Sequence, residues 1–478
     1  MPAHRATALP GHATFPLALI EEVVAEAESR EQRRRLLPAA AVMVFVLGCC
    51  LFSGEGYGEV ARKLADWLGP LAGRRWHVPG SSALAKARRR LGIRPFELLF
   101  SRLAGPLADA GTAGAHAFGR RLLLMSVDGT TLDVPYTPAN IAAFGLPHGG
   151  GGGGGGFPQV RLLALIGCGT RGLAGAAFGP RKTSEQDLAR KVAAGGALGP
   201  GDLVLADRNF SGHPVAAAIT ASGADVIIRA RSCQLLPVLE ELPDGSYLSV
   251  LPDPAAAQRR HGRNGDRRRR GSKLPPDTAP LPGIPVRVIE ADITAWPAGG
   301  SPRTTRFRLI TTLAGPAEAP AAQVAALYAE RWESETGFRE LKVFLRGAGR
   351  VLRSRDPGGV TQEIWALLCA CQLIHATRAA AAAAADCDPD RVSYTVTLRA
   401  IRRRITAGPG SGPAAAGRAA VTEILARLLP VMRRSRSYPR ALHTSTARRR
   451  AARATSLGTI TYKITIAARP GTPGQPGP

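Results

Sequence analysis

The sequence contains few of the patterns that build zinc sites or disulfide frameworks. It has seven cysteines, an odd number, and no two of them form a CxxC pair. Its nine histidines form no HxxxH pair. The usual signatures of a structural zinc site and of a small disulfide-stapled domain are therefore absent. We expect the cysteines to behave as small hydrophobic residues in a reducing compartment.

Long hydrophobic runs are also scarce. The one extended apolar stretch, LPAAAVMVFVLGCCLF at 37–52, follows three arginines at 33–35. It is shorter than the roughly 20 residues that a membrane-spanning helix needs. It also begins too far from Met1 for an ordinary signal peptide. The sequence therefore predicts a buried core helix here and no membrane partner.

Acidic residues are scarce relative to basic ones. The 478-residue chain has 63 Lys and Arg against 36 Asp and Glu, which gives a net charge of +27 and a pI near 11.1. A folded protein of this charge most often binds nucleic acid, because neutralising phosphates releases counterions. A ribosomal or membrane-surface role is the competing interpretation. The high content of Ala, Gly, Pro and Arg is also typical of a GC-rich genome, so the charge supports nucleic-acid binding without proving it.

Residues 1–118 read as a mostly helical N-terminal domain. Within it, SSALAKARRRLG at 81–92 predicts a short helix that ends at the glycine. The helix carries three consecutive arginines, Arg88, Arg89 and Arg90. A basic helix followed by a turn and a second helix fits a DNA-binding module. A plain helical bundle with a solvated basic face fits equally well, and both interpretations stay open.

Residues 119–231 change to an α/β pattern. RLLLMSVDGTTLDV at 121–134 and QVRLLALIGCG at 159–169 predict strands, and GLAGAAFGP predicts a third. A helix, a strand, a helix and a strand follow, so we expect a mixed sheet. The eight glycines at 149–156 are followed by neither Lys-Ser/Thr nor a helix, so they form no phosphate loop. They predict a flexible connection.

The rest of the chain alternates between β-rich and helical composition. Residues 232–315 predict a β-rich insertion with a basic arm at 259–273. Residues 316–405 predict helices that complete the core. Residues 406–478 predict a basic C-terminal tail, partly disordered, with eight arginines and no acid at 433–453. Both basic segments suit phosphate contacts that do not read sequence.

The segment LYAERWESETGFRELK at 327–342 predicts one helix with an unusual stripe. Tyr328, Arg331, Glu335 and Lys342 recur at helical spacing and so share one face. Burying unpaired charges at a packing edge is costly. Taken alone, the segment is therefore most simply a solvated ladder of i,i+4 salt bridges.

Three acidic residues stand out by position. Asp128 and Asp207 are each predicted at the end of a strand, and Glu335 lies on the helix just described. Each alone is consistent with a turn cap or a surface ion pair. Gathered at one sheet edge, however, three carboxylates without a His or Cys cluster would suit Mg²⁺ or Mn²⁺. Two such ions, about 3.5–4 Å apart, support in-line phosphoryl transfer.

Several segments occur in a specific order: SVDGTTLDVPYTPANIAAFG, FPQVRLLALIGCGT, GDLVLADRNFSG, LYAERWESETGFRELK and LRSRDPGGVTQEIWALL. Together they resemble the DDE transposases of the insertion-sequence four family. Tyr328, Arg331, Glu335 and Lys342 match that family's Y-x2-R-x3-E-x6-K signature at every spacing. The segments LPAAAVMVFVLGCCLF, YGEVARKL and ALAKARRRLG resemble its N-terminal domain, so the resemblance covers roughly residues 20–400.

The resemblance implies a fold and a site. The fold class is α/β, a ribonuclease-H-like mixed sheet with a β-rich insertion, preceded by an all-helical N-terminal domain. Asp128, Asp207 and Glu335 become the catalytic, metal-binding triad. The DNA-binding residues expected are Tyr328, Arg331 and Lys342 from the signature, with Arg88, Arg89 and Arg90 from the N-terminal helix.

The resemblance also implies an activity. The protein would bind the terminal inverted repeats of its element, cleave the 3′ ends and join them to target DNA, with two Mg²⁺ or Mn²⁺ ions. Water would attack first and the freed 3′-hydroxyl second. We expect double-stranded DNA as partner, a homodimer in the DNA complex, and a bacterial, cytoplasmic, nucleoid-associated location. The alternatives are a sequence-tolerant nuclease of the same fold and a decayed or domesticated DNA-binding protein.

Overall fold

The computed structural model describes residues 15–29, 37–72, 77–147, 156–260, 282–296, 301–408, 413–430 and 461–467. Residue contacts divide the chain into two compact units, each assembled from separate stretches of sequence. The first unit comprises Met1–His116, Leu123–Ala197 and Trp332–Met432. The second unit comprises Ala117–Leu122, Leu198–Arg331 and Arg433–Pro478.

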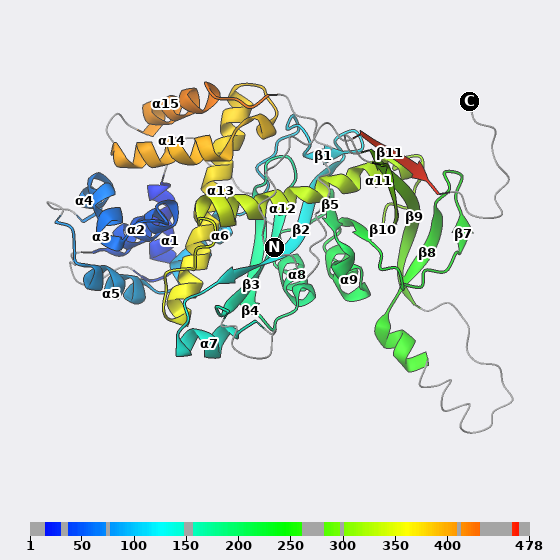
Figure 1. Ribbon diagram of the computed structural model, residues 1–478, viewed down its shortest axis with the longest axis horizontal. Coiled ribbons are helices and arrows are strands. Elements are labelled where there is room, and N and C mark those ends of the chain that lie inside the picture. The colour runs from blue at the N-terminus through cyan, green and yellow to red at the C-terminus, as the bar shows by residue number, and fades with distance from the viewer. Residues whose placement is uncertain are drawn as a thin grey trace. The chain divides into compact units, whose positions relative to one another are not determined.

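The N-terminal part of the first unit is helical, as predicted (Figure 1). The helices are α1 Leu17–Glu26, α2 Ala39–Leu51, α3 Tyr57–Lys63, α4 Ala65–Ala72, α5 Ser81–Leu91 and α6 Arg94–Leu103. Every residue of α2 except Ala40 is buried, so the prediction of a core helix is confirmed. Burial also raises the pKa of the Cys49 thiol in α2 to about 12, and none of the cysteines forms a disulfide. Five of the seven thiols are buried and act as core side chains, whereas Cys233 is exposed and Cys387 is partly buried.

The helix α13 (Pro357–Ala384) packs against α2, α6 and α14 (Tyr394–Thr406). By length and composition it could cross a membrane, but 72% of its apolar window is buried within the protein, as expected for a central core helix. The side chain of Asp356 begins the helix by accepting a hydrogen bond from the Gly359 N–H at 2.8 Å. After α14, helix α15 (Pro413–Leu425) lies in the region predicted as an irregular tail.

Antiparallel strands complete the first unit. β2 (Leu122–Asp133) pairs with β3 (Gln159–Gly167), and β3 pairs with β4 (Leu173–Pro180). The three strands predicted from hydrophobic pattern are thus confirmed. Helix α7 (Pro138–Phe144) follows β2, and helix α8 (Glu185–Ala194) packs on β3 and β4. The register sets Asp128 opposite Ala164.

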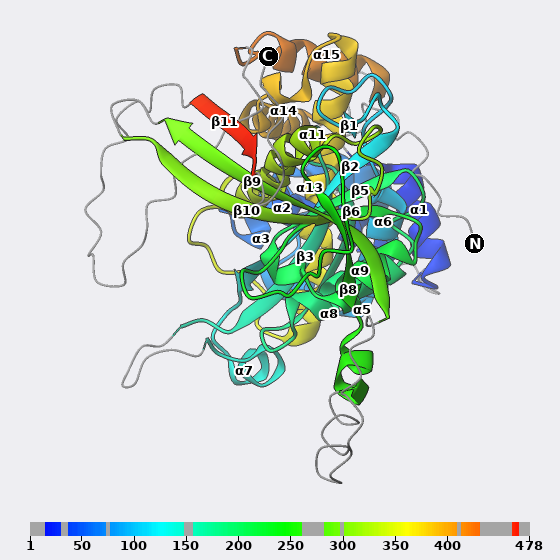
Figure 2. The same cartoon turned by 90° about the vertical axis from the view of Figure 1, so that its right-hand side faces the viewer.

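The second unit has a parallel pair extended by antiparallel strands. β5 (Asp202–Ala206) runs parallel to β6 (Asp225–Arg229), and α9 (His213–Thr220) connects them. The strand order continues β6-β10-β9-β8-β7. The added strands are β10 Arg303–Thr311, β9 Gly283–Trp296, β8 Tyr247–Pro252 and β7 Glu240–Glu241. Figure 2 shows the long strands β9 and β10 side by side.

The fold class is therefore confirmed: a helical N-terminal region precedes a mixed sheet with parallel core strands and a β-rich insertion. One strand was not predicted. It is β11 (Thr461–Ile466), which lies within the C-terminal tail and pairs with β9. The short β1 (His116–Ala117) pairs with β2. The basic segment 433–453, most of the basic arm 259–273 and all of the glycine tract except Gly156 lie outside the described residues.

Candidate active site

The first acidic residue lies on β2, the longest strand of the first unit. Asp128 is in the middle of β2, not at its end as predicted, because the strand continues to Asp133. Its Oδ1 accepts a hydrogen bond from the Gly129 N–H at 2.8 Å. Its Oδ2 lies 3.4 Å from the Ser334 hydroxyl, which donates to it. Ser334 is fully buried, so this contact ties β2 to the helix that carries Glu335.

The segment predicted as one helix changes its pitch along its length. A 3₁₀ turn spans Tyr328–Arg331, α12 spans Trp332–Arg339, and a π-helical segment spans Glu340–Leu345. The predicted segment is therefore helical throughout, but it contains three helix types in succession. The Arg346 N–H bonds the Leu341 carbonyl at 3.0 Å, which is the wider i→i+5 spacing. Such π segments occur frequently at functional sites.

The widened turn brings Lys342 to the same strand as Asp128. The Lys342 ammonium donates to the Thr130 hydroxyl at 3.1 Å. Thr130 is two residues from Asp128 and therefore on the same face of β2. Burial lowers the pKa of Lys342, and the neighbouring Arg346 acts in the same direction. Because burial and Arg346 both disfavour the charged form of Lys342, an anion bound beside it would stabilise that form.

Close backbone contacts fix the position of α12 on the sheet. A Cβ added to Gly337 would lie 3.1 Å from the Cδ1 of Ile166, a residue of β3. A Cβ added to Gly129 would lie 2.7 Å from the carboxylate of Glu185. A Cβ at either position would therefore require the end of the Ile166 or Glu185 side chain to shift. Sequence reasoning missed Glu185, an acidic side chain beside the backbone of the Asp128 strand.

The second unit holds the third acidic residue and two signature residues. Asp207 follows directly after the buried strand β5, as predicted, and its Oδ1 accepts a hydrogen bond from the Asn209 N–H at 2.8 Å. Tyr328 is buried, and burial raises the pKa of its hydroxyl to about 12, against the opposing charges of Arg331 and Arg229. The Arg331 guanidinium lies 6.0 Å from the centre of the Tyr328 ring.

Arginines concentrate around this second group. Burial lowers the pKa of Arg229, and the charges of Arg208 and Arg331 lower it further, whereas Asp207 raises it. The Arg229 guanidinium also covers the ring of Phe307 at 4.0 Å. A bound anion would reduce the mutual repulsion of Arg208, Arg229 and Arg331. This cluster therefore has the positive charge needed to bind a phosphate.

The predicted residues thus fall into two groups. The first unit brings Asp128 next to Ser334 and Lys342 next to Thr130, with Glu335 adjacent to Ser334 in the chain. Asp207, Tyr328 and Arg331 belong to the second unit. No group of three or more His, Cys, Asp or Glu side chains within the described ranges is arranged as a metal site. The donor chemistry nevertheless fits Mg²⁺ or Mn²⁺, because all three acids are carboxylates and those of Asp128 and Asp207 are each held by a backbone N–H.

The three N-terminal arginines have different environments. Arg88 is buried and donates to Gln362 at 3.0 Å and to Ser354 at 3.2 Å. This corrects the prediction of a DNA-facing side chain at Arg88, because its guanidinium is committed to the interior. Arg90 donates to a backbone carbonyl at 2.7 Å. The side chain of Arg89 is 72% exposed.

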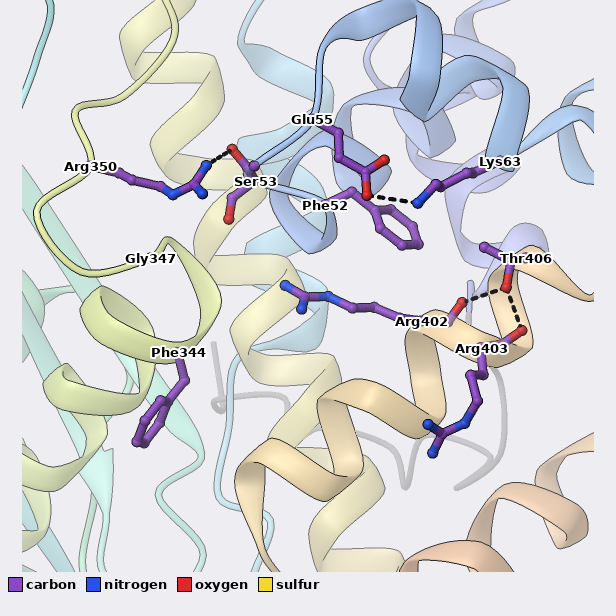
Figure 3. A pocket seen from close by; sticks show the side chains of 11 residues that line it. Phe52, Ser53, Glu55, Lys63, Phe344, Gly347, Arg350, Arg402, Arg403 and Thr406 are labelled. Atoms are coloured by element: carbon purple, nitrogen blue, oxygen red, sulfur yellow. Dashed lines mark hydrogen bonds and ion pairs between the residues drawn. The ribbon is translucent and has the colours of Figure 1, made fainter.

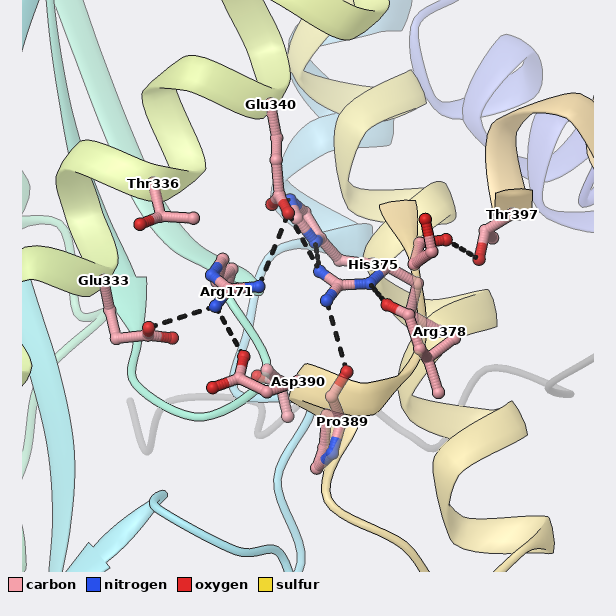
Figure 4. A network of polar contacts seen from close by, with 12 residues as sticks. Arg171, Glu333, Thr336, Glu340, His375, Arg378, Pro389, Asp390 and Thr397 are labelled. Atoms are coloured by element: carbon pink, nitrogen blue, oxygen red, sulfur yellow. Dashed lines mark hydrogen bonds and ion pairs between the residues drawn. The ribbon is translucent and has the colours of Figure 1, made fainter. Parts of the chain in front are cut away.

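A buried ionic network holds the opposite side of α12 and was not predicted (Figure 4). Arg171, in the turn between β3 and β4, lies 3.1 Å from Glu333 and 3.4 Å from Glu340, and it also pairs with Asp390. Burial alone would lower the pKa of Arg171, but these carboxylates raise it above its ordinary value. Arg378 on α13 lies 3.5 Å from Glu340. The network therefore joins the Glu335 helix to the sheet and to the helical core.

Comparisons with known proteins match both halves of the chain. Residues 11–101 match the family described as insertion element 4 transposase N-terminal, and residues 120–373 match the transposase DDE domain. The chain is 27% identical to transposase InsG for insertion sequence element IS4 of Escherichia coli (strain K12) over 359 residues, 74% of this chain and 73% of that protein. A cryo-EM structure of a piggyBac transposase synaptic complex with hairpin DNA aligns with a TM-score of 0.39 at 8% identity, covering 84% and 78% of the two chains.

Proposed function

Because the chain belongs to the insertion-sequence four family of DDE transposases, we propose that it cleaves the 3′ ends of its element and joins them to target DNA. The observation that carries this proposal is the joining of β2 to α12, where Asp128 meets Ser334 and Lys342 meets Thr130. A strand carboxylate and a helix carboxylate next to a cation are what metal-dependent phosphoryl transfer requires. Terminal inverted repeats and target DNA are the proposed substrates.

Asp128, Asp207 and Glu335 are the proposed holders of two Mg²⁺ or Mn²⁺ ions. When bound, such ions activate the attacking oxygen and offset charge on the phosphate. The protein's part is to hold each carboxylate in place. Asp128 and Asp207 each accept a hydrogen bond from a backbone N–H, which supports a fixed orientation.

The basic signature residues have positioning roles in this proposal. Lys342, half-buried beside β2, holds a phosphate oxygen of the DNA. Arg331 contacts the DNA backbone from the second unit, and its neighbour Tyr328 supports it. Arg89, the exposed member of the N-terminal arginines, contributes to DNA binding in place of Arg88. Such contacts position DNA without reading its sequence.

Two further proposals follow from family membership alone. The protein acts as a homodimer in its DNA complex. Its place of action is the bacterial cytoplasm, on the nucleoid, where its substrate lies. Sedimentation of the protein with and without paired element ends tests the dimer, and imaging of a tagged chain tests the location.

The proposed activity is tested with labelled element ends and purified protein. Asp128→Asn, Asp207→Asn and Glu335→Gln should each abolish cleavage and the joining of pre-cleaved ends, because one site serves both reactions. DNA binding should persist, because the arginines that dominate affinity are unchanged. Mg²⁺ and Mn²⁺ should support the reaction better than Ca²⁺, whose coordination is larger and looser.

Three outcomes would contradict the proposal. Cleavage of unrelated DNA at the same rate, without joining, would identify a sequence-tolerant nuclease. Specific binding without cleavage under any divalent ion would identify a DNA-binding protein that has lost its activity. Wild-type cleavage by Glu335→Gln would remove the helix from catalysis.

A further inference from the structure

An open cavity of about 500 Å³ lies within the first unit, away from the proposed catalytic residues, none of which lines it (Figure 3). One wall is the loop that follows α2, with Phe52 and Glu55. The facing walls come from Arg350, after the π segment, and from Arg402 on α14. Lys63, at the end of α3, closes one side. Three segments that are distant in sequence therefore build one concave surface.

The cavity is lined by more positive than negative charge. Its one lining carboxylate, Glu55, is already bonded to Lys63 at 2.7 Å. A further lining cation, Arg403, pairs with Glu423 outside the cavity. Arg350 and Arg402 are different: in the part of the chain that the structure describes, neither forms an ion pair with a carboxylate.

The two unbalanced arginines are held in place by the backbone. Arg350 donates to the Ser53 carbonyl at 3.1 Å, and Arg402 donates through Nε to the Leu51 carbonyl at 2.7 Å. Burial lowers the pKa of Arg402; the Tyr394 hydroxyl and the Glu55 carboxylate raise it, and the charges of Arg399 and Arg350 lower it further. Each guanidinium has five N–H donors and uses few of them on these carbonyls. The remaining donors and the uncompensated charge are suited to a planar or tetrahedral oxyanion.

We propose that this cavity binds a phosphate group of the DNA backbone through Arg350 and Arg402. The proposal rests on the proposed function for the nature of the partner, but not for the chemistry of the site. DNA is favoured over a free nucleotide because the cavity is open rather than enclosed and belongs to a chain with a net charge of +27. A phosphate contact here would anchor DNA to the helical part of the first unit.

The test uses the full-length protein and a fluorescent DNA duplex, with affinity measured by anisotropy at several salt concentrations. The variant Arg350→Gln/Arg402→Gln should weaken binding and reduce the slope of log K against log salt by about 0.9 for each phosphate lost. Arg350→Lys/Arg402→Lys keeps the charge and should restore most of the slope. Arg62→Gln is the matched control, because Arg62 is exposed on α3, pairs with Glu59 and does not line the cavity.

A second arm distinguishes DNA from a small phosphate ligand. Pyrophosphate is added to each protein, and its melting temperature is recorded. If pyrophosphate at low millimolar concentration stabilises the wild type but not the double glutamine variant, while the salt slopes are equal, the site binds small phosphates and the DNA proposal is overturned. If neither measurement separates the variant from wild type and Arg62→Gln, the cavity binds no phosphate. If the double glutamine variant does not fold, the single variants Arg350→Gln and Arg402→Gln decide: a reduced salt slope in either one supports the phosphate site, and a wild-type slope in both overturns it.

The outcome does not depend on cleavage. Glu335→Gln should bind DNA with the wild-type salt slope although it does not cut. If the wild type also fails to cut but the cavity variants still lose slope, the proposed transposase activity fails and the phosphate site stands. If the wild type cuts and the cavity variants keep their slope, the proposed transposase activity stands and the phosphate site fails.

Discussion

Replacing Arg171 with methionine removes the central cation of the buried network beside α12. The Arg171 side chain is 9% exposed, and the carboxylates that it contacts on Glu333, Glu340 and Asp390 are 12%, 7% and 19% exposed. At this depth solvent screening is weak, so the low values typical of surface ion pairs do not apply. Methionine fills similar space but removes the guanidinium that these three carboxylates share, whereas Glu340 keeps its contact with Arg378.

The expected loss of stability follows from that imbalance. Removing one partner of a buried ion pair costs about 3–5 kcal/mol, because the other charge stays desolvated. At roughly 1–2 °C per kcal/mol, which the unfolding entropy per residue gives for a unit of about 300 residues or more, the melting temperature should fall by roughly 3–10 °C. Arg171→Lys should fall between wild type and Arg171→Met, because it keeps the charge but loses the planar donors that reach several carboxylates.

The assay is urea unfolding followed by circular dichroism, with thermal melting alongside. Arg62→Met is the control for losing an arginine, because its ion pair with Glu59 is exposed and should leave the unfolding midpoint unchanged. An Arg171→Met protein with the wild-type urea midpoint at pH 7 would refute the view that this network stabilises the fold.

Further predictions concern other parts of the first unit. Lys342→Met should melt at or slightly above the wild-type temperature, because burial already lowers the pKa of this cation, yet DNA cleavage should fall; equal losses of stability and cleavage would contradict the positioning role. Burial holds the pKa of His375 well below its ordinary value, so below about pH 6.5 the unfolded state gains a proton that the folded state does not. The free energy of unfolding should therefore fall by up to about 1.4 kcal/mol for each pH unit below 6.5. The His375→Phe variant should lack this contribution to the pH dependence between pH 5 and 7. Gly48→Ala should lower the free energy of unfolding by about 1–3 kcal/mol, because its Cβ would lie 2.5 Å from a Leu64 methyl, whereas Gly58→Ala meets only a 3.9 Å contact and should be neutral or stabilising; equal urea midpoints for the two variants would contradict this.

Local hydrophobic pattern was enough to predict much of the fold. The uninterrupted apolar run at 37–52 became the buried helix α2, and the strand patterns at 121–134 and 159–169 became β2 and β3. The hydrophobic pattern of each of these elements comes from residues that are adjacent in the chain, so it can be recognised in a single sequence. The strand at Thr461–Ile466 also has a local signal, because Tyr, Ile and Ile alternate with Thr, Lys and Thr, but its basic and Gly/Pro-rich surroundings obscured it.

The buried charges could not be predicted, because their partners are distant in sequence. Arg171 stands in the turn sequence GTRGL and meets carboxylates more than 160 residues away. Arg88 looked like part of a basic surface, yet it bonds Gln362, 274 residues further along the chain. A single sequence offers no periodic pattern for such pairs. Only the fold decides which arginines are buried.

Partners that are distant in sequence also explain the mixture of charges on the helix that carries Glu335. Glu333 and Glu340 are seven residues apart and both meet Arg171, whereas Ser334 meets the Asp128 strand. Rotating the helix by one residue, about 100°, would take both glutamates away from Arg171 and leave buried charges unpaired. It would also move Glu335, the residue after Ser334, away from its place next to that strand. Apolar packing tolerates small rotations at little cost, but the ionic network does not. The buried acids therefore determine which face of the helix carries Glu335.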